Sequence, residues 1–318
     1  MKPYFPIFRL FVILCAGATF ALSTSHTTAT ASATASATAT EDKTHPPTFE
    51  HYLELFHSLA QSSIDLQLET LAYSNEQNPI VALHFGDKTK PNIHINAVHH
   101  GDERISLEAV IAIINQLVET GNQPSGTGLH NYSYTFIPIV NPDGFIYSQR
   151  LSTNKVDLNR SYILERDETP IEIAAVKDTL AKTKPIAALA FHAGLEAILW
   201  PWGNKATPPK AAPILSAIGQ NLAHQGKLAY YGQSFYDYKT KGEFIDYAYE
   251  KYGTFAFTAE VSYSRSIEPK TLVKTQKRAI LIFNSLVNSL ELLMNQKLVL
   301  KKNIKPNFVK FTQGNQAF

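Results

Sequence analysis

The feature that most constrains this chain is a histidine and a glutamate, His100 and Glu103, directly after an apolar run from Ile93 to Val98. The run predicts a buried strand, so both side chains emerge where that strand ends, which is where α/β proteins place their chemistry. A catalytic zinc site takes two imidazoles and one carboxylate and leaves a fourth position open. His100 and Glu103 would supply two of these three ligands.

The third ligand is expected at the end of another strand, and His192 stands at such a point. The four-residue spacing is weak on its own, because the chain repeats it by chance at His51 and Glu54, inside an expected helix. His99 is the rival to His100, but only His100 has a glutamate three residues later. We therefore prefer His100 as the first ligand.

Apolar periodicity along the rest of the chain alternates between strands and helices. Strands are expected at residues 66–73, 80–85, 93–98, 134–140, 187–191, 228–231 and 254–259, and helices at 49–61, 107–119, 171–181, 211–224 and 271–295. Strands that alternate with helices imply a mostly parallel sheet covered on both faces. We expect a single α/β domain over residues 47–297, with His94 in its core or beside the site.

The N-terminus indicates an export signal rather than a membrane anchor. Lys2 and Arg9 precede an apolar run over residues 10–21 that is too short to span a bilayer, and small residues follow at a plausible cleavage point. We expect a signal peptide over residues 1–23, a Thr-, Ala- and Ser-rich disordered linker over 24–46 and a C-terminal tail over 298–318.

Charge and cysteine content limit the partners of the mature chain. Removing Lys2 and Arg9 from the 29 basic residues leaves 27, equal to the 27 acidic residues, and nucleic acid is therefore a poor partner. Cys15, the only cysteine, would be lost with the signal, which leaves neither a disulfide nor a thiolate ligand for a metal. This suits a bacterial periplasmic or secreted protein, with no transmembrane anchor in the mature chain.

A series of further motifs follows His100 and Glu103. In order they are Asn141-Pro142-Asp143-Gly144, Arg150, Asp157-Leu158-Asn159-Arg160, His192, Tyr238 and Glu260. Over about residues 47–297 this series resembles the zinc metallocarboxypeptidase family typified by carboxypeptidase A, whose zinc site has two histidines and one glutamate. The resemblance implies a mixed sheet of about eight strands between helices. It also implies one Zn²⁺ per chain, held by His100, Glu103 and His192.

The resemblance assigns catalytic roles to two residues. Glu260 would be the general base that takes a proton from the attacking water and passes it to the leaving amine. Arg150 would stabilise the oxyanion of the tetrahedral intermediate. Asp102 departs from the animal digestive enzymes, which carry arginine at that place, whereas small bacterial members often read His-Gly-Asp-Glu as this chain does.

Four residues are expected to bind substrate, which would be a peptide or muropeptide with a free C-terminal carboxylate. Asn159 and Arg160 match the pair that grips this carboxylate, for which the planar guanidinium group is well suited. Tyr238 matches the tyrosine that caps the bound end residue. Ile245 is expected at the bottom of the side-chain pocket, where it would favour an apolar end residue.

The substrate class stays open. Asp237 and Glu243 flank the same loop as Ile245 and would suit a cationic end residue. The pattern Tyr238, Gly242, Phe244 resembles the murein peptide amidase branch, which cuts cell-wall peptides at diaminopimelate, whereas residues 198–203 resemble the general carboxypeptidases.

Two further classes of function remain as alternatives. One is a catalytically silent carboxylate-binding module, which the presence of every expected ligand and of Glu260 disfavours. The other is an aminoacylase-like deacylase, which the Asn159 and Arg160 pair disfavours because that pair suits substrates with a free carboxylate.

Overall fold

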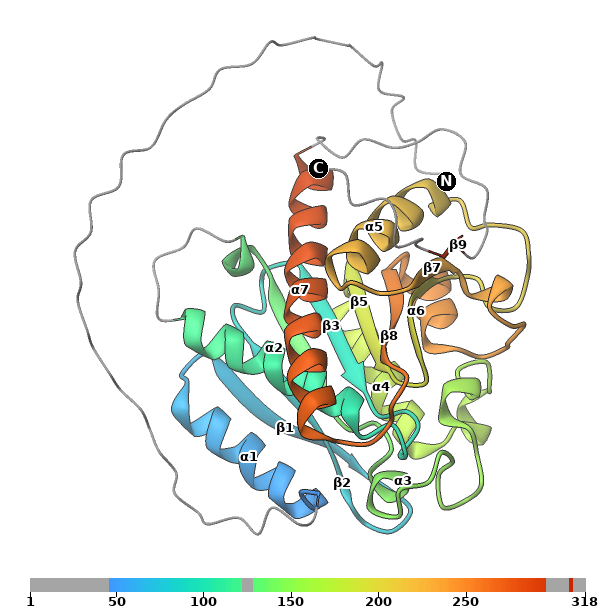
Figure 1. Ribbon diagram of the computed structural model, residues 1–318. Coiled ribbons are helices and arrows are strands. Elements are labelled where there is room, and N and C mark those ends of the chain that lie inside the picture. The colour runs from blue at the N-terminus through green and yellow to red at the C-terminus, as the bar shows by residue number, and fades with distance from the viewer. Residues whose placement is uncertain (1–45, 122–127, 296–308, 311–318) are drawn as a thin grey trace, which may run out of the picture. The chain divides into compact units, whose positions relative to one another are not determined.

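The computed structural model describes residues 46–121, 128–295 and 309–310. The expected signal peptide, residues 24–45 of the expected linker, and the expected tail apart from Val309–Lys310 lie outside this range. Residues 46–121 and 128–295 form the predicted α/β fold, a mixed sheet with helices on both faces (Figure 1). Within the described residues, no helix is both long and apolar enough to cross a membrane.

The described part of the sheet has nine strands in the order β1-β2-β4-β3-β5-β8-β6-β7-β9. They are β1 (Leu66–Tyr73), β2 (Pro79–Phe85), β3 (Asn92–Ala97), β4 (Ser133–Ile137), β5 (Ala187–His192), β6 (Leu195–Trp200), β7 (Tyr230–Gln233), β8 (Phe255–Ser262) and the two-residue β9 (Val309–Lys310). The four central strands β4, β3, β5 and β8 are parallel. Antiparallel pairs lie toward the two edges, so the predicted mixed sheet is confirmed.

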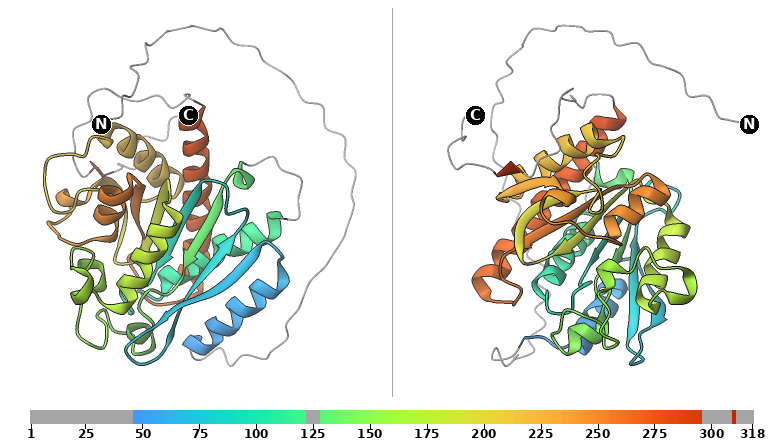
Figure 2. Two further views of the ribbon diagram at one scale, coloured as in Figure 1. Left: turned by 180° about the vertical axis from the view of Figure 1, so that it is seen from behind. Right: turned by 90° about the vertical axis from the view of Figure 1, so that its right-hand side faces the viewer.

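Helices cover both faces of this sheet (Figures 1 and 2). One apolar cluster joins the sheet to α1 (Phe49–Ser62), α2 (Ile105–Gly121), α5 (Ala212–Gln225) and α7 (Pro269–Met294). A second cluster, on the other face, joins it to α4 (Ile171–Thr183) and α6 (Phe244–Tyr252). Every residue of β3, β4 and β5 is buried. β5 is an apolar run, as expected of a strand buried on both faces, whereas buried polar residues alternate with apolar ones in β3 and β4.

Several elements differ from the sequence prediction. The strand β6 and the short helices α3 (Pro142–Ile146) and α6 were not predicted. The strand expected at 134–140 ends at Ile137, and the strand expected to end at residue 259 continues to Ser262, because β6 pairs with it in antiparallel register from Leu195. Glu260 therefore lies within β8 rather than after it.

Two neighbouring strands place the candidate site. β3 and β5 are adjacent and parallel, so their carboxyl ends meet at one edge of the sheet. His192 is the last residue of β5, and His100 lies in the turn that follows β3. The turn packs closely on α3, because a Cβ atom at Gly101 would lie 2.0 Å from the carbonyl carbon of Gly144. Only glycine fits this contact without a backbone shift.

Candidate metal centre

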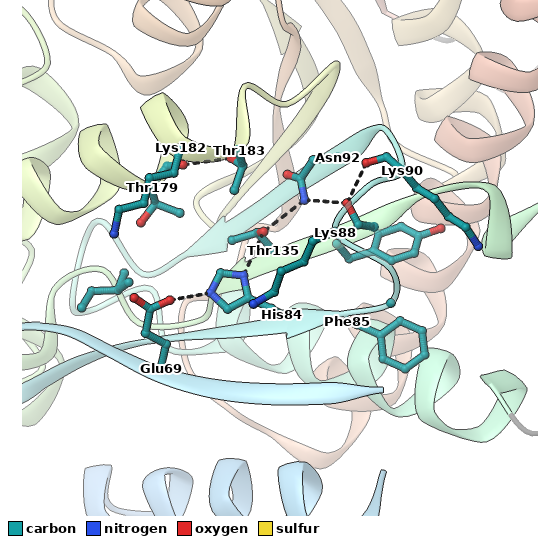
Figure 3. Close-up of a pocket in the computed structure, with 14 residues that line it drawn as sticks. Glu69, His84, Phe85, Lys88, Lys90, Asn92, Thr135, Thr179, Lys182 and Thr183 are labelled. Atoms are coloured by element: carbon teal, nitrogen blue, oxygen red, sulfur yellow. Dashed lines mark hydrogen bonds and ion pairs between the residues drawn. The ribbon is translucent and has the colours of Figure 1, made fainter. Parts of the chain in front are cut away.

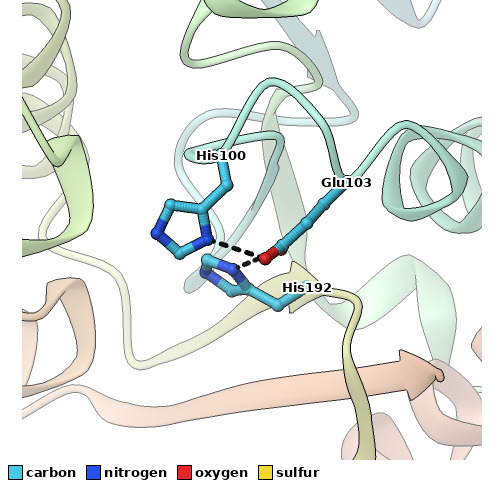
Figure 4. A group of neighbouring side chains, drawn as sticks. All are labelled: His100, Glu103 and His192. Carbon is cyan, nitrogen blue, oxygen red and sulfur yellow. Dashed lines mark hydrogen bonds and ion pairs between the residues drawn. The ribbon is translucent and has the colours of Figure 1, made fainter. Parts of the chain in front are cut away.

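Three buried side chains meet where β3 and β5 end (Figure 4). Glu103 Oε1 lies 2.8 Å from His100 Nδ1, and Glu103 Oε2 lies 2.9 Å from His192 Nδ1. One possible ligand atom from each residue lies within 4.8 Å of the others. This is the donor set of two imidazoles and one carboxylate that the sequence predicted for a zinc site.

The backbone holds Glu103 in this position. Its amide nitrogen donates to the carbonyl oxygen of His100 at 3.1 Å, which closes the turn that leads into α2. Its carboxylate also accepts a hydrogen bond from the backbone nitrogen of Ala193 at 3.0 Å, so it joins the chain on both sides of the site. Burial disfavours the charged carboxylate, but the neighbouring His192 and His100 outweigh this effect and hold the pKa of Glu103 below its usual range.

Asp157 contacts the outer side of the first histidine. Asp157 Oδ1 lies 3.2 Å from His100 Nε2, and Arg150 donates to Asp157 Oδ2 at 2.9 Å. A carboxylate can only accept, so Asp157 and Glu103 both favour a proton on the His100 nitrogen that faces them, and although burial lowers the pKa of His100 these contacts raise it above its usual value. If Nδ1 gives up its proton to hold a metal ion, the Nε2 proton would still point to Asp157. Such carboxylate–histidine pairs orient metal ligands. Asp157 belongs to a motif that the sequence shows, but the sequence alone does not indicate this role.

The other two histidines near this strand end make different contacts. His99 Nε2 lies 2.7 Å from the hydroxyl oxygen of Tyr162, and the His99 ring stacks on His192 with centroids 5.4 Å apart. His94 is fully buried and stacks on Phe244. The structure therefore brings His100, and not His99, next to Glu103.

Glu260 lies beside the same group. In the register between β5 and β8 it stands opposite His192, and its Oε2 atom is out of solvent without a hydrogen-bond partner among the described residues. Burial, together with the negative charges of Glu103 and Asp237, raises the pKa of Glu260 well above its usual value. A buried carboxyl group with an unpaired oxygen is suited to accept or donate a hydrogen bond to a molecule bound in the site.

Arg150 and the expected carboxylate-binding pair border the site. Arg150 Nη1 lies 3.7 Å from Glu103 Oε1. Asn159 Nδ2 lies 3.4 Å from His192 Nε2, and Asn159 Oδ1 accepts from the backbone nitrogen of Phe244 at 3.0 Å.

Arg160 adjoins this group. It donates to the carbonyl oxygen of Asn159 at 2.8 Å and to the hydroxyl of the exposed Tyr238 at 2.6 Å. Asn159, Arg160 and Tyr238 are thus joined to one another beside the three predicted ligands.

Ile245 does not join this group. It is the second residue of α6, fully buried in the apolar cluster between α6 and the sheet, where it packs with residues such as Ala188 and Ala256. The acidic side chain of Glu243, in contrast, lies beside Arg160. Glu243 Oε1 is 3.7 Å from Arg160 Nη1, and Glu243 Oε2 accepts a hydrogen bond from Ser234 Oγ at 3.0 Å.

Comparison with known proteins decides the family. A model of the zinc carboxypeptidase family matches residues 52–281. The chain belongs to this family. Zinc carboxypeptidase A 1 of Drosophila melanogaster is 26% identical over 202 residues, covering 51% of this chain and 46% of that protein. The chain thus spans about half the length of the curated relative it matches.

Solved structures show the same fold at low sequence identity. Carboxypeptidase A from Helicoverpa armigera has a TM-score of 0.68 at 18% identity, covering 77% of this chain and 74% of that one. A metallo-carboxypeptidase from Burkholderia cenocepacia has a TM-score of 0.67 at 15% identity, covering 78% and 70%. The cofactor of the zinc carboxypeptidase family is zinc, and the cluster of two imidazoles and one buried carboxylate fits that ion.

Asp157→Asn should weaken zinc binding by about 10- to 100-fold, because it removes the charged partner that orients His100. Dialysis against graded chelator, followed by metal analysis, measures the loss. Asp87→Asn is the matched control, since Asp87 is an exposed aspartate whose side chain bonds only to Thr89 among the described residues. Equal zinc retention in folded Asp157→Asn and wild-type protein would show that His100 needs no such partner.

Proposed function

We propose that this chain is an exported zinc-dependent carboxypeptidase that hydrolyses the C-terminal peptide bond of peptides. The observation that carries the proposal is the juxtaposition of the His100, Glu103 and His192 cluster with the joined Asn159, Arg160 and Tyr238 side chains. A metal-ligand set beside a group that suits a carboxylate is the arrangement an exopeptidase needs. Export rests on residues 1–23, and N-terminal sequencing of the mature protein tests that boundary.

His100, Glu103 and His192 would hold the zinc. When bound, the ion polarises the scissile carbonyl and lowers the pKa of the attacking water. Glu260 takes a proton from that water and delivers it to the leaving amine nitrogen, so that the peptide bond breaks as the new carboxylate forms.

Arg150 supplies positive charge to the oxygen of the scissile carbonyl. Its guanidinium is held by Asp157 and lies near Glu103, so little reorientation is needed as negative charge develops on that oxygen. Asn159 and Arg160 bind the substrate's terminal carboxylate, and the exposed Tyr238 closes over the end residue. The free carboxylate thereby sets which peptide bond reaches Glu260.

Acidic side chains near Arg160 support a cationic end residue. Glu243 is buried, and burial raises its pKa despite the nearby Arg160. Burial and the Glu243 charge raise the pKa of Asp246 to about 7, and burial also raises the pKa of Asp237. Crowded carboxyl groups of this kind are stabilised by a positive charge. Lysine, arginine or the amino group of diaminopimelate would supply it, which keeps the cell-wall peptidase as the second candidate.

Glu260→Gln should keep zinc and fold but lose at least about a thousandfold in kcat, because the amide keeps the shape of the side chain and cannot accept the proton. Steady-state assays with metal analysis measure both quantities. Glu54→Gln is the matched control, since Glu54 is exposed on α1 in the chance repeat of the His-x-x-Glu spacing. A kcat within tenfold of wild type would mean that another group activates the water.

A C-terminally amidated peptide should be cut at least about a hundredfold more slowly than the free acid, because Arg160 would then face a neutral amide. The ratio of the two kcat/KM values should fall toward one in Arg160→Ala. The control variant Arg166→Ala, which removes an exposed arginine, should keep the wild-type ratio of the two kcat/KM values. Equal cleavage of both peptides by wild type would exclude an exopeptidase and favour an endopeptidase or a deacylase.

Peptides that end in lysine should be cut at least about tenfold faster, by kcat/KM, than matched peptides that end in leucine. Glu243→Gln should reduce this preference, and Glu250→Gln, which changes an exposed glutamate of α6, should not. The preference is the ratio of kcat/KM for the lysine-ended peptide to kcat/KM for the leucine-ended one. A loss of activity that affects both peptides equally, such as one caused by removing the contact of Glu243 with Arg160, therefore leaves it unchanged. A preference for leucine in wild type would reject the cationic assignment, and faster cleavage of peptides ending in diaminopimelate would favour the cell-wall candidate.

A further inference from the structure

Arg265 is a charged residue beside the candidate metal centre to which the proposed mechanism gives no role. It lies three residues after the end of β8, and its carbonyl oxygen accepts from the backbone nitrogen of Ile105, the first residue of α2, at 3.0 Å. Its Nη1 atom donates to Asp102 Oδ2 at 2.6 Å, and Asp102 directly precedes the predicted ligand Glu103. Backbone and side-chain contacts therefore both hold Arg265 next to the site.

One edge of the Arg265 guanidinium group is open. Nη1 is paired with Asp102, but Nε and Nη2 have no hydrogen-bond partner among the described residues. A Cβ atom at Gly194 would lie 3.4 Å from Nη2 and 3.7 Å from Nε, so this edge lies over a residue that has no side chain to cover it. The side chain of Arg265 is 45% exposed. The Nε and Nη2 donors point in parallel and together fit the two oxygens of a carboxylate.

The polar side chains at the opposite edge of the sheet differ from Arg265 in this respect. There Glu69 pairs with His84, and further hydrogen bonds join His84 to Thr135 and Thr135 to Asn92 (Figure 3). These contacts tie β1, β2, β4 and β3 together, which gives those side chains a structural role.

The predicted ligands lie between Arg265 and the proposed carboxylate-binding pair. Asn159 contacts the Nε2 atom of His192, whereas Glu103 contacts the Nδ1 atom on the other side of the same ring. Arg160 follows Asn159 in the chain, and Arg265 pairs with the residue before Glu103. A peptide whose end carboxylate lies at Arg160 and whose scissile bond lies at the ligands therefore extends its acyl half toward Arg265.

Charge divides the site in the same way. The acidic side chains of Asp237 and Glu243 lie on the Arg160 side, where they suit a cationic end residue. Arg265 brings positive charge to the acyl side. Burial raises the pKa of Glu260, and the positive charge of Arg265 opposes this increase, which places Arg265 near the group that acts on the scissile bond.

We propose that Arg265 binds a carboxylate on the residue that supplies the scissile carbonyl, so that substrates with an acidic group there are preferred. This inference rests on the proposed function. The carboxylate pairs with Nε and Nη2, while Asp102 retains Nη1 and keeps the guanidinium in place. Two chemistries present such a group: the side chain of an α-linked glutamate, and the α-carboxylate of a γ-linked glutamate.

Two pairs of acetylated tripeptides, assayed with the zinc-loaded enzyme, test this proposal. Each peptide ends in lysine or leucine, whichever the wild type cleaves faster. The first pair carries α-linked glutamate or glutamine before the end residue, and the second carries γ-linked glutamate with its α-carboxylate free or amidated. In at least one pair the acid should be cleaved at least about threefold faster than the amide, by kcat/KM, and the pair that shows the preference identifies the linkage.

Arg265→Gln should bring the ratio of acid to amide cleavage to one or below, while kcat/KM for the amide peptides stays within about threefold of wild type. The matched control Arg166→Gln, which changes another exposed arginine, should keep the wild-type ratio. A parallel loss on both peptides of a pair in Arg265→Gln would mean that Arg265 only holds the loop, and would overturn the proposal.

Equal cleavage of acid and amide peptides by wild type would also overturn the proposal, and it would leave the hydrolytic function standing. Absence of cleavage of every peptide by zinc-loaded wild type would instead reject the hydrolytic function, and the role of Arg265 with it.

Discussion

The carboxylate of Glu103 is the contact on which the candidate site depends. It is buried, and burying a single carboxylate without partners costs several kcal/mol. Its two oxygens contact both histidine rings and the backbone of Ala193, so the ends of β3 and β5 must stay together for the charge to be compensated. The close packing of Gly101 on α3, and the Asn141 side chain that donates to the carbonyl oxygens of His99 and Arg150, hold the surrounding turn in place.

The same parallel strands give the molecule two chemically different edges. At their carboxyl ends, β3 and β5 carry the histidines and acidic groups of the candidate metal centre. At their amino ends, β3 and β4 contribute Asn92, Ser133 and Thr135, and the neighbouring lysines make that edge cationic. Parallel packing sorts residues to one edge or the other according to their position in the strand, and the candidate metal centre lies at the carboxyl-end edge, where α/β sheets place their ligands.

Sequence patterns succeeded where burial is uniform or where chemistry is local. The strand β5 is buried on both faces and appears as an apolar run, and the spacing of His100 and Glu103 follows from a single turn. Patterns failed where tertiary contacts decide the outcome. The signals that begin α3, a capping Asn141 followed by proline, also describe a turn, and five residues leave no helical period to detect. The helix α6, which buries Ile245, was not predicted either, because its position depends on its packing against the sheet.

The charge balance of the site links its ligands to its proposed chemistry. Glu103, Asp157 and Glu260 lie close together, and Arg150 is the cation that pairs directly with the first two. Burial weakens solvent screening, so this excess of carboxylates raises the free energy of the site until a cation joins it. A divalent ion held by His100, Glu103 and His192 would restore the balance and lower the tendency of Glu260 to stay protonated. The geometry that binds the ion would then also prepare Glu260 for its proposed role as a base.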